Sequence, residues 1–405
     1  MATQCDVLVV GAGPGGGSAA LHAARAGLKV MLIEDHEEIG APVHCGECIS
    51  DVAIANLNLS LPESVISKRV HGIRVIFPDG TKKRLTEHGY VLEKHLFEQW
   101  IADEAVSAGA TLHLGHRLRS MERMETDGKF IGHRCEGKGD AFPIEARIVI
   151  DASGVAGICS KMLKLNKRPK VIAGIQYEML EVPTDDYLDF YIWPQYAEKG
   201  YLWMIPKRDG RANVGLVTEG AVKGLDRFIA DTEFRDLEVV NPPWRDESRK
   251  IRGFGGSIPI SGPHDHTHAD GLMLVGDAAG FTSPLFEGGS HLALKSAQFA
   301  ALTAAEAIAA DDVTAAALSP YPARWKEEFP PYHKILRGKH ALYSLSDRDM
   351  SIMGRCFPEE MGDMGVLGKA MVGFRLLFRR PWLYVRGIIP AMLAFGYSRA
   401  KYYGW

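Results

Sequence analysis

The stretch Asp6–Val10 (DVLVV), with Gly11–Gly16 (GAGPGG) directly after it, decides the fold. The first five residues are an apolar, β-branched run, which predicts a buried parallel strand. An alanine-rich helix is expected over Ser18–Ala26, followed by a second apolar strand over Leu28–Ile33 that ends at Glu34. Glycine spacing alone is a weak signal. Strand, glycine turn, helix, second strand and terminal acid together are typical of a dinucleotide-binding unit.

Each glycine and the acid has a chemical role in such a unit. Gly11 allows a sharp turn off the strand, Gly13 leaves room for a pyrophosphate against bare backbone, and Gly16 lets helix and strand pack closely. The free N–H groups at the start of the helix then face the phosphates. Glu34 can accept hydrogen bonds from a ribose, and its charge would repel a 2′-phosphate, which favours FAD or NAD over NADP. The alternative is a glycine-rich turn that binds nothing.

Composition sets the class of protein. The chain has 405 residues, 46% of them hydrophobic, and a net charge of −3, so two or three globular subdomains are expected. Basic residues form no block interleaved with aromatics, which argues against a nucleic-acid partner. The first strand begins close to the N-terminus, and no run of 18 apolar residues occurs, so neither a signal peptide nor a transmembrane helix is predicted. The six cysteines are mostly scattered, which fits a reducing cytoplasm.

The chain up to residue 170 predicts more of the first sheet, with one hairpin beside it. The loop Ile39–Ser50 (IGAPVHCGECIS) holds too many Gly, Pro and Cys for regular structure. The expected elements are a hairpin of Val70–Phe77 and Lys82–Leu85, a helix over Leu92–Ala108, a strand over Thr111–Leu114, a small antiparallel excursion over Arg119–Ile131 and His133–Ile150, and a returning strand over Arg147–Ile150.

From Val171 the pattern changes to antiparallel strands, which we assign to a substrate domain. The expected elements are strands over Val171–Leu180, Leu188–Trp193, Tyr201–Ile205 and Asn213–Val217, an amphipathic helix over Val222–Asp231, and a return strand near Arg252–Pro259.

Two further turns stand at the ends of predicted parallel strands, where ligands of such sheets bind. Asp151–Gly154 (DASG) is the first. The second is Gly276–Gly280 (GDAAG), after the apolar run Gly271–Val275. In that turn Asp277 can hydrogen-bond a ribityl hydroxyl and Gly280 allows close backbone approach; a plain helix cap is the alternative for Asp277.

A long helix, His291–Ala310, is predicted after Gly288-Gly289. Its positive end would lie beside an isoalloxazine ring and stabilise charge on the reduced ring.

These motifs stand in an order that resembles the geranylgeranyl reductase family of flavoproteins, within the larger p-hydroxybenzoate-hydroxylase-like group. The resemblance covers roughly residues 6–310 and rests most specifically on the Cys45-Gly46-Glu47 loop and on the Tyr201–Pro206 strand (YLWMIP). It implies reduction of isolated double bonds in polyprenyl chains of lipids or quinones by hydride from the N5 atom of reduced FAD. A flavin-dependent monooxygenase or halogenase acting on an aromatic substrate is the alternative, because Pro284–Ala297 also looks like the halogenases. A flavin-carrying electron-transfer subunit is a third class.

The fold implied is α/β: a Rossmann-like (GR2-type) FAD-binding domain, an inserted antiparallel-sheet substrate domain and a helical C-terminal region. The expected boundaries are 1–69, 90–170 and 265–315 for the FAD domain, 70–89 and 171–264 for the substrate domain, and 316–405 for the helical region. The residues implied to contact FAD are Gly11, Gly13, Gly15, Gly16, Glu34, Cys45, Gly46, Cys48, Lys94, Leu118, Asp277, Gly280, Gly288, Gly289 and Ser290.

The substrate would lie against the Tyr201–Pro206 strand. Tyr201 and Trp203 alternate along it, so they face one side and would line an apolar tunnel for a prenyl chain, with Pro206 at the strand's end. Without the resemblance they would be ordinary sheet-core aromatics.

Five positions depart from the family pattern. Cys48 replaces a glycine, Lys94 replaces an arginine and so loses the planar fork for phosphate, and Glu287 lies in a loop that is usually richer in glycine, as do Ser290 and His291. Cys45-x-x-Cys48 leaves three interpretations open: two thiols of which only Cys45 matters, a redox-active pair, or a zinc site. Zinc would need two more ligands, and the candidates are His264, His266 and His268. No metal is predicted.

The reaction needs hydride at one alkene carbon and a proton at the other. We expect Cys45, kept as a neutral thiol by apolar surroundings, to be the proton donor or to position the water that is. No second G-x-G-x-x-G is present for a nicotinamide cofactor, so the flavin's electrons come from outside. Ferredoxin, another reduced carrier, and transient NAD(P)H all remain open as that donor.

The C-terminal tail is basic and apolar. No acidic residue follows Asp363. Either the tail's helices pack on the body with basic outer faces, or residues 365–405 rest peripherally on the inner face of an anionic membrane. The basic residues are Lys369, Arg375, Arg379, Arg380, Arg386, Arg399 and Lys401, and the aromatics expected at headgroup level are Trp382, Tyr384, Tyr402, Tyr403 and Trp405.

Overall fold

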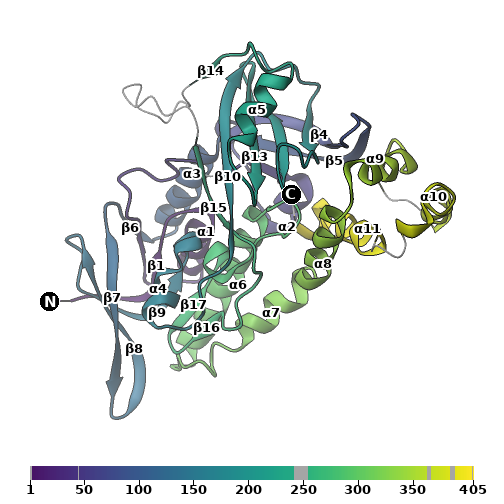
Figure 1. Ribbon diagram of the computed structural model, residues 1–405. Helices are drawn as coiled ribbons and strands as arrows, with labels where there is room; N and C mark the ends of the chain where they lie inside the picture. Colours follow the sequence, from purple (N-terminus) through teal and green to yellow (C-terminus); the bar gives the residue numbers. More distant parts are fainter. Residues whose placement is uncertain (1, 44, 241–253, 363–365, 384–387, 404) are drawn as a thin grey trace.

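Two β-sheets and a helical C-terminal region make up the molecule (Figure 1). The computed structural model describes residues 2–43, 45–240, 254–362, 366–383, 388–403 and 405. Arg252, Tyr384 and Arg386, each part of a sequence-based prediction, lie outside the described residues, as do the side chains of Lys369 and Tyr403.

The first sheet contains the dinucleotide-binding unit predicted from the N-terminal motif. Its strand order is β16-β17-β9-β1-β2-β6, and β1 pairs in parallel with both β2 and β9. A long hairpin, β7–β8, extends from this sheet by the pairing of β8 with β9 (Figure 1). The strands are β1 (Thr3–Val10), β2 (Val30–Ile33), β6 (Thr111–His113), β7 (Arg117–Thr126), β8 (Lys129–Lys138), β9 (Ile144–Asp151), β16 (His268–Ala269) and β17 (Leu272–Leu274).

Three helices pack together beside this sheet: α1 (Pro14–Arg25), α3 (Lys94–Ser107) and α6 (Ser290–Ala309). Small side chains allow the close approach, since most alanines of α1 and α6 are buried. Helix α1 begins four residues before the predicted Ser18, because Pro14 occupies the first helical position and suits a helix start. The apolar run of β1 is fully buried, as predicted for a parallel strand.

The second sheet has the order β14-β10-β13-β12-β11-β4-β5-β3, with β15 paired to β10. Its pairings are antiparallel except for β4 with β11, which run parallel. The strands are β3 (Cys48–Ser50), β4 (Ile66–Ile76), β5 (Lys82–Leu92), β10 (Val171–Leu180), β11 (Tyr187–Tyr191), β12 (Tyr201–Pro206), β13 (Arg211–Thr218), β14 (Val239–Val240) and β15 (Phe254–Pro259).

One local prediction was wrong. The loop Ile39–Ser50 was expected to lack regular structure, but its last three residues form β3, which pairs with β5 through Cys48 and Val91. The pairing partner lies far along the chain, so composition alone could not indicate it.

The remaining helices include the C-terminal region, where α7 and α8 lead to α9–α11 at the right of Figure 1. Their bounds are α2 (Asp51–Leu57), α4 (Ile158–Met162), α5 (Gly224–Asp231), α7 (Pro320–Glu328), α8 (Tyr332–Tyr343), α9 (Asp347–Cys356), α10 (Val366–Arg379), α11 (Ile388–Tyr397) and α12 (Ala400–Tyr403); short 3₁₀ turns are η1 (Glu63–Val65), η2 (Gly154–Ala156), η3 (Gly276–Ala279) and η4 (Pro381–Leu383).

Helices α8 and α11 pack closely at Gly338, where an added Cβ would lie 2.3 Å from Ala394. The division of the whole chain into domains at the boundaries given above stays a prediction.

Candidate functional site

The turn between β1 and α1 has the shape of a phosphate cradle. A Cβ on Gly16 would lie 1.7 Å from the Gly11 carbonyl oxygen, and one on Gly11, whose φ is +98°, would lie 2.6 Å from Ala152 O. A Cβ on Gly13, by contrast, would meet no atom within 4 Å. Gly13 precedes the first turn of α1 and offers no side-chain cap, so the helix N–H groups are available to a phosphate. This geometry fits a dinucleotide.

Glu34 directly follows β2 and is held beside this cradle. Its Oε2 accepts a 2.7 Å hydrogen bond from Ala12 N, and its Oε1 lies 2.5 Å from His36 Nδ1. Burial acts to raise the pKa of Glu34, but the hydrogen bonds from Ala12 and His36 outweigh it, and the pKa is lowered. The side chain is therefore a carboxylate at the position where a ribose would be bound.

Two other residues predicted to contact FAD, Gly15 and Leu118, are buried. A Cβ on Gly15 would face Val275 and Ala293, so Gly15 lies where α1 packs against α6. Leu118 is buried in β7.

Asp277 forms the second cluster of predicted cofactor residues, with Gly289 and Lys94. A Cβ on Gly289 would lie 3.4 Å from Asp277 Oδ1, and Thr282 Oγ1 donates to the same oxygen at 3.1 Å. Burial raises the pKa of Asp277, and the Thr282 hydrogen bond and the Lys94 charge offset only part of that rise. Lys94 itself is paired with Glu98 on α3.

Three more predicted residues belong to the same loop. Gly280 follows η3 with a φ of +77°, in the left-handed region that favours glycine, and Ser290 begins α6. Gly288 lies against the Trp405 backbone, 2.6 Å from where its Cβ would be.

The Cys45 loop, residues Cys45-Gly46-Glu47, is a tight turn against β12. Glu47 has a φ of +71°, and its N–H donates to Cys45 Sγ at 3.2 Å. A Cβ on Gly46 would lie 2.9 Å from Ile205 Cδ1. Burial raises the pKa of the Cys48 thiol well above its usual range, so this thiol stays protonated.

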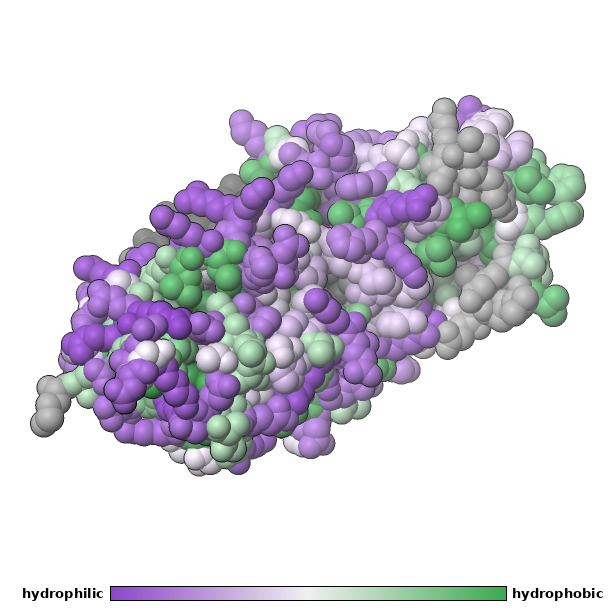
Figure 2. Space-filling view, turned by 90° about the horizontal axis from the view of Figure 1, so that it is seen from below, coloured by the Kyte–Doolittle hydropathy of each residue, from purple (hydrophilic) through white to green (hydrophobic). Residues whose placement is uncertain are grey.

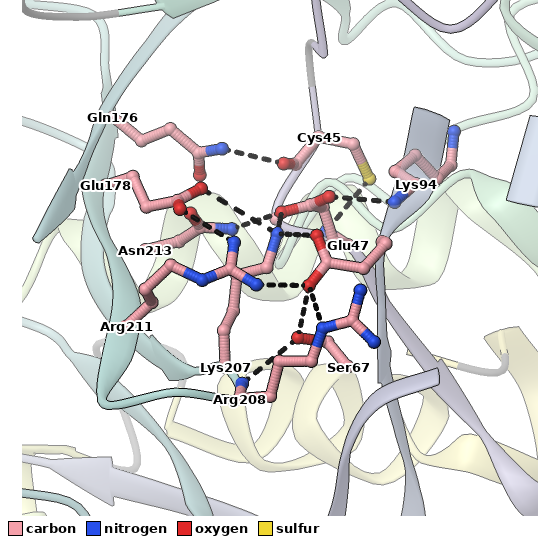
Figure 3. Close-up of polar contacts among 12 residues, drawn as sticks. Cys45, Glu47, Ser67, Lys94, Gln176, Glu178, Lys207, Arg208, Arg211 and Asn213 are labelled. Carbon is pink, nitrogen blue, oxygen red and sulfur yellow. Dashed lines mark hydrogen bonds and ion pairs between the residues drawn. The ribbon is translucent and has the colours of Figure 1, made fainter. Parts of the chain in front are cut away.

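Glu47 anchors that loop. Its side chain accepts hydrogen bonds from Lys94 N at 2.9 Å, Lys207 Nζ at 2.7 Å and Asn213 Nδ2 at 2.6 Å (Figure 3). Its carbonyl oxygen accepts from Leu92 N at 2.8 Å. Both carboxylate oxygens and the backbone are thus engaged, which fixes the position of Cys45.

Glu47 belongs to an ionic network that sequence reasoning did not predict. The network consists of Glu47, Glu93, Glu178, Lys207 and Arg211, and Figure 3 labels four of them: Glu47, Glu178, Lys207 and Arg211. The Lys207 side chain is 0% exposed and lies 3.0 Å from Glu93 and 3.8 Å from Glu178, while Arg211 bonds both of those carboxylates.

Positive charges in the network offset the effect of burial on the pKa of Glu93. Burial acts to raise the pKa of Glu93, but Lys207, Arg211 and Ser67 lower it to about 2. The signal in the sequence was three polar or charged residues in or beside strands: Glu178 and Asn213 pair across β10 and β13, and Lys207 follows β12 directly.

A hydrogen-bonded chain joins the Cys45 loop to β12. Gln176 Nε2 donates to Cys45 O at 2.9 Å, and Trp203 Nε1 donates to Gln176 Oε1 at 3.0 Å. Tyr201 and Trp203 lie on one face of β12, with ring centroids 5.8 Å apart, while Pro206 is buried at the strand's end.

The two rings are part of an aromatic cluster, defined as Phe190, Tyr201, Trp203, Phe286 and Phe395. Phe190, Tyr201 and Phe286 have mutual centroid distances of 5.4 Å, and Phe286 lies 5.9 Å from Phe395 of α11. Strand, loop and tail helix therefore meet in one largely buried apolar cluster that begins at the Cys45 loop and ends at the loop before α6.

Cys45 and Cys48 are not joined by a disulfide bond in this structure. Among the described residues, two groups of side chains are close enough together to hold a metal ion: His113, His116 and Asp140, and Glu34, Asp35 and His36. Neither cysteine belongs to them, nor do His264, His266 and His268.

The tail corrects part of the membrane prediction. Trp405 Nε1 donates to Glu87 Oε2, Arg399 pairs with Glu87, and the Tyr402 ring lies tilted 5.4 Å from that of Tyr397. Tyr402 and Trp405 therefore pack on the body rather than standing at a headgroup level. Trp382 is half exposed. In the described part of the chain, no helix is both long and apolar enough to span a bilayer.

Comparisons with known proteins agree with this geometry. Residues 6–162 match the family described as FAD dependent oxidoreductase, and residues 171–240 match the geranylgeranyl reductase catalytic domain. Digeranylgeranylglycerophospholipid reductase 2 of Methanopyrus kandleri is 33% identical over 370 residues, 88% of this chain and 91% of that protein. Digeranylgeranylglycerophospholipid reductase 1 of Methanothermobacter thermautotrophicus is 35% identical over 372 residues, 89% of this chain and 92% of that protein.

Solved structures with a similar fold include a reductase-like protein and a flavin-dependent enzyme. A geranylgeranyl bacteriochlorophyll reductase-like protein of Thermoplasma acidophilum superimposes with a TM-score of 0.81 at 29% identity, covering 96% of this chain and 100% of that one. A flavin-dependent brominase superimposes with a TM-score of 0.69 at 17% identity, covering 96% of this chain and 93% of that one, which shows a shared fold alone.

Proposed function

The chain belongs to the geranylgeranyl reductase family of FAD-dependent oxidoreductases, and on that premise we propose that it reduces isolated C=C bonds of geranylgeranyl-type chains in a membrane lipid or a prenylated quinone. When bound and reduced, FAD supplies the hydride. The chain's own residues bind the cofactor, orient the alkene, exclude water and hold the proton.

The cofactor would be held by both clusters described above. The Gly11–Gly16 turn and Glu34 fit the ADP part, while Asp277, Gly289 and Lys94 lie together at the end of the sheet where the flavin would follow. Gly46 and Cys48, on the side of β12, would complete the flavin's surroundings.

The aromatic cluster is the observation that carries the proposed substrate. Five aromatic rings from β11, β12, the loop before α6 and α11 form one apolar surface, and that surface touches the Cys45 loop through Trp203 and Gln176. A prenyl chain is flexible and apolar, so it gains by burial against such rings. Cys45 lies at one end of this surface, where it would donate the proton to the alkene or position the donor.

The activity is tested by mass spectrometry. Dithionite-reduced, FAD-loaded protein is incubated without oxygen with a geranylgeranyl glycerophospholipid or a prenylated quinone. The expected products are heavier in steps of two hydrogens, and Cys45→Ala is expected to slow their formation. Unchanged substrate mass with fully flavin-loaded protein would overturn the proposed function, and full turnover by Cys45→Ala would overturn the role of that thiol alone.

The electrons that reduce the flavin would come from a separate donor. Ferredoxin, another reduced carrier or NAD(P)H is proposed, since the sequence has no second nucleotide-binding motif. Anaerobic bleaching of the oxidised flavin by each reductant in turn identifies which of them serves.

A peripheral membrane contact is proposed through α10 and the start of α11. One face of these helices presents large apolar side chains to solvent, with Phe374 62% and Phe378 73% exposed. Figure 2 shows these hydrophobic residues gathered at the end of the molecule where α10 lies. The patch comprises Leu367, Met371, Phe374, Leu377, Phe378, Trp382, Ile389 and Leu393.

Charge around the patch suits an anionic lipid surface. Arg375 and Arg379 are exposed on α10, and the sequence has no acidic residue after Asp363. The same tail reaches the aromatic cluster through Phe395, so a lipid chain leaving the membrane would meet the site directly.

Vesicle co-sedimentation tests this contact. Replacement of Phe374 and Phe378 by serine is expected to weaken binding to anionic vesicles by at least about tenfold, because two aromatic rings lose their apolar environment. The control is Leu302→Ser, since Leu302 is 50% exposed on α6, away from the patch. Equal binding by both variants would contradict the proposed surface.

A further inference from the structure

Glu287 is a buried carboxyl group in the loop that leads into α6. Its side chain is 2% exposed and its φ is +47°. Lys339 of α8, whose side chain is 5% exposed, donates to Glu287 Oε1 at 2.6 Å. The neighbours of Glu287 in sequence are Phe286, a member of the aromatic cluster, and Gly288.

The second oxygen of Glu287 is left without a bond. Among the described residues, Oε2 has no hydrogen-bond partner, and neither does the buried hydroxyl of Tyr343, also on α8. Tyr201, the central ring of the aromatic cluster, contacts the Glu287 side chain and donates its hydroxyl to Phe286 O at 2.6 Å. Glu287 therefore offers one uncommitted oxygen beside the proposed substrate surface.

The charged and titratable groups around Glu287 come from two elements. Lys339, Tyr332 and Tyr343 belong to α8, and Tyr201 belongs to β12. Cys48 lies close enough to Tyr201 to raise the pKa of its hydroxyl. Burial raises the pKa of Glu287 from 4.5 to about 7, and the Lys339 charge offsets only part of that rise. A carboxyl group so placed keeps its proton near neutral pH, as acids in apolar pockets do.

Hydrogenation of an alkene needs such a group. The proton must reach a carbon atom in a place that excludes water, and a neutral carboxylic acid can be buried there at much lower cost than a charged one. We propose that Glu287 is the acid that donates the proton to the substrate alkene, with Cys45 positioning the reacting bond from the opposite end of the aromatic cluster. The proposal rests on the proposed function.

The O–H bond of Glu287 breaks as a C–H bond forms at one alkene carbon, and the hydride and its two electrons reach the other carbon from the reductant, reduced FAD. The substrate is reduced, the flavin is oxidised, and Glu287 is left as a carboxylate. Lys339 stabilises that carboxylate until water returns the proton.

The principal test is Glu287→Gln, which keeps the shape of the side chain and removes the proton. Turnover of the reduced holoenzyme is expected to fall by about 10²- to 10³-fold, with KM and FAD binding unchanged. Glu287→Asp is expected to restore part of the rate. The control is Glu306→Gln, because Glu306 lies on α6 but pairs with Arg324 on the surface.

The pH profile separates an acid from a structural side chain. Wild-type turnover is expected to fall above about pH 7, and Cys45→Ala to keep that decline while reacting more slowly. A profile that stays flat between about pH 6 and 9 in the wild type would overturn the proposal even if Glu287→Gln failed to fold.

A readout without turnover completes the test. The infrared band of a protonated carboxyl group, in the difference between wild type and Glu287→Gln with FAD oxidised and no substrate, is expected to disappear as pH rises through about 7. Full activity with an unchanged profile in Glu287→Gln, or a band already absent at pH 5, would overturn the role of Glu287 and leave the proposed function standing. A wild type that reduces no prenyl chain at all would overturn the function itself.

Discussion

Glu47 and Glu287 occupy similar positions on opposite sides of the site. Each lies in a tight loop with a left-handed backbone, with φ of +71° and +47°. Each carboxylate is buried and pairs with a buried lysine, Lys207 at 2.7 Å and Lys339 at 2.6 Å. Each loop also touches the aromatic cluster, one through Gln176 and Trp203, the other through Phe286 and Tyr201.

Glu47 and Glu287 differ in how many hydrogen bonds their carboxyl groups accept. Glu47 accepts three hydrogen bonds through its carboxylate, whereas Glu287 accepts one from Lys339 and leaves Oε2 unpartnered among the described residues. A buried carboxylate whose two oxygens are both engaged is held rigidly, and a half-satisfied buried carboxyl keeps a chemical option open. The contrast teaches that one glutamate holds the Cys45 loop and the other holds a proton.

Replacing the two lysines gives the largest expected difference. Lys207→Met removes the lysine that pairs with Glu47, while Arg211 still pairs with Glu93 and Glu178 and Arg208 with Glu93, so a loss of about 3–5 kcal/mol in the free energy of unfolding is expected. Lys339→Met is expected to cost only about 1 kcal/mol near pH 6, because Glu287 can take a proton. Chemical denaturation measures the free energy of unfolding of both variants. Equal losses would show that Glu47 and Glu287 do not differ in their need for a paired lysine.

The pH dependence of the free energy of unfolding is the next test of the difference between Glu47 and Glu287. Folded Glu287 keeps its proton up to about pH 7, while the unfolded chain releases it near 4.5, so the folded state binds more protons in between and stability falls as pH rises through that window. The loss amounts to at most about 3 kcal/mol. Denaturant titrations at several pH values are expected to show it in the wild type and not in Glu287→Gln.

Glu93 of the ionic network should behave in the opposite way. Its pKa is lowered from 4.5 to about 2, so its contribution is present above pH 4.5 and is lost as pH falls toward 2. A variant Glu93→Gln that left the acid limb of the stability curve unchanged would contradict this assignment.

Glu47→Gln tests the anchoring role directly. The amide has one acceptor oxygen, so it cannot accept from Lys94 N at one position and from Lys207 and Asn213 at the other as the carboxylate does; a loss of about 2 kcal/mol and faster alkylation of Cys45 are expected. Glu359→Gln is the control, since Glu359 pairs with Arg84 at the surface. An alkylation rate equal to that of the wild type would show that the loop is held by other contacts.

The smallest expected effect concerns the link through Trp203. Trp203→Phe keeps a ring and removes the Nε1–H donated to Gln176, so about 1 kcal/mol is lost and Cys45 reacts somewhat faster. Trp193→Phe removes a similar bond, to Phe77 O, and is expected to cost as much stability without changing Cys45. If both variants expose Cys45 equally, the chain through Gln176 does not position it.

Sequence predicted those parts of the fold whose signals are local. The unit from β1 to β2 follows from an apolar run and a glycine spacing, and β10 has the predicted bounds, Val171–Leu180. β3 was missed because its partner β5 lies about forty residues away, and the tail aromatics Tyr402 and Trp405 were misplaced because their contacts with the body are tertiary.

The candidate site was predicted unevenly for the same reason. The Cys45 loop, Asp277 and the Tyr201–Trp203 strand stand in recognisable motifs, so they could be named in advance. The ionic network joins side chains from four separate segments, which no local pattern reveals. Glu287 was noticeable only as a departure from a glycine-rich loop, and its pairing with Lys339 required the packing of α8.

The central claim is that this protein passes a hydride from reduced FAD to an isolated alkene. Its most direct test is anaerobic stopped-flow absorbance after mixing the reduced, FAD-loaded protein with a geranylgeranyl lipid. The oxidised flavin spectrum is expected to return with the unsaturated lipid and not with its fully saturated analogue. A flavin that stays reduced with both lipids would contradict it.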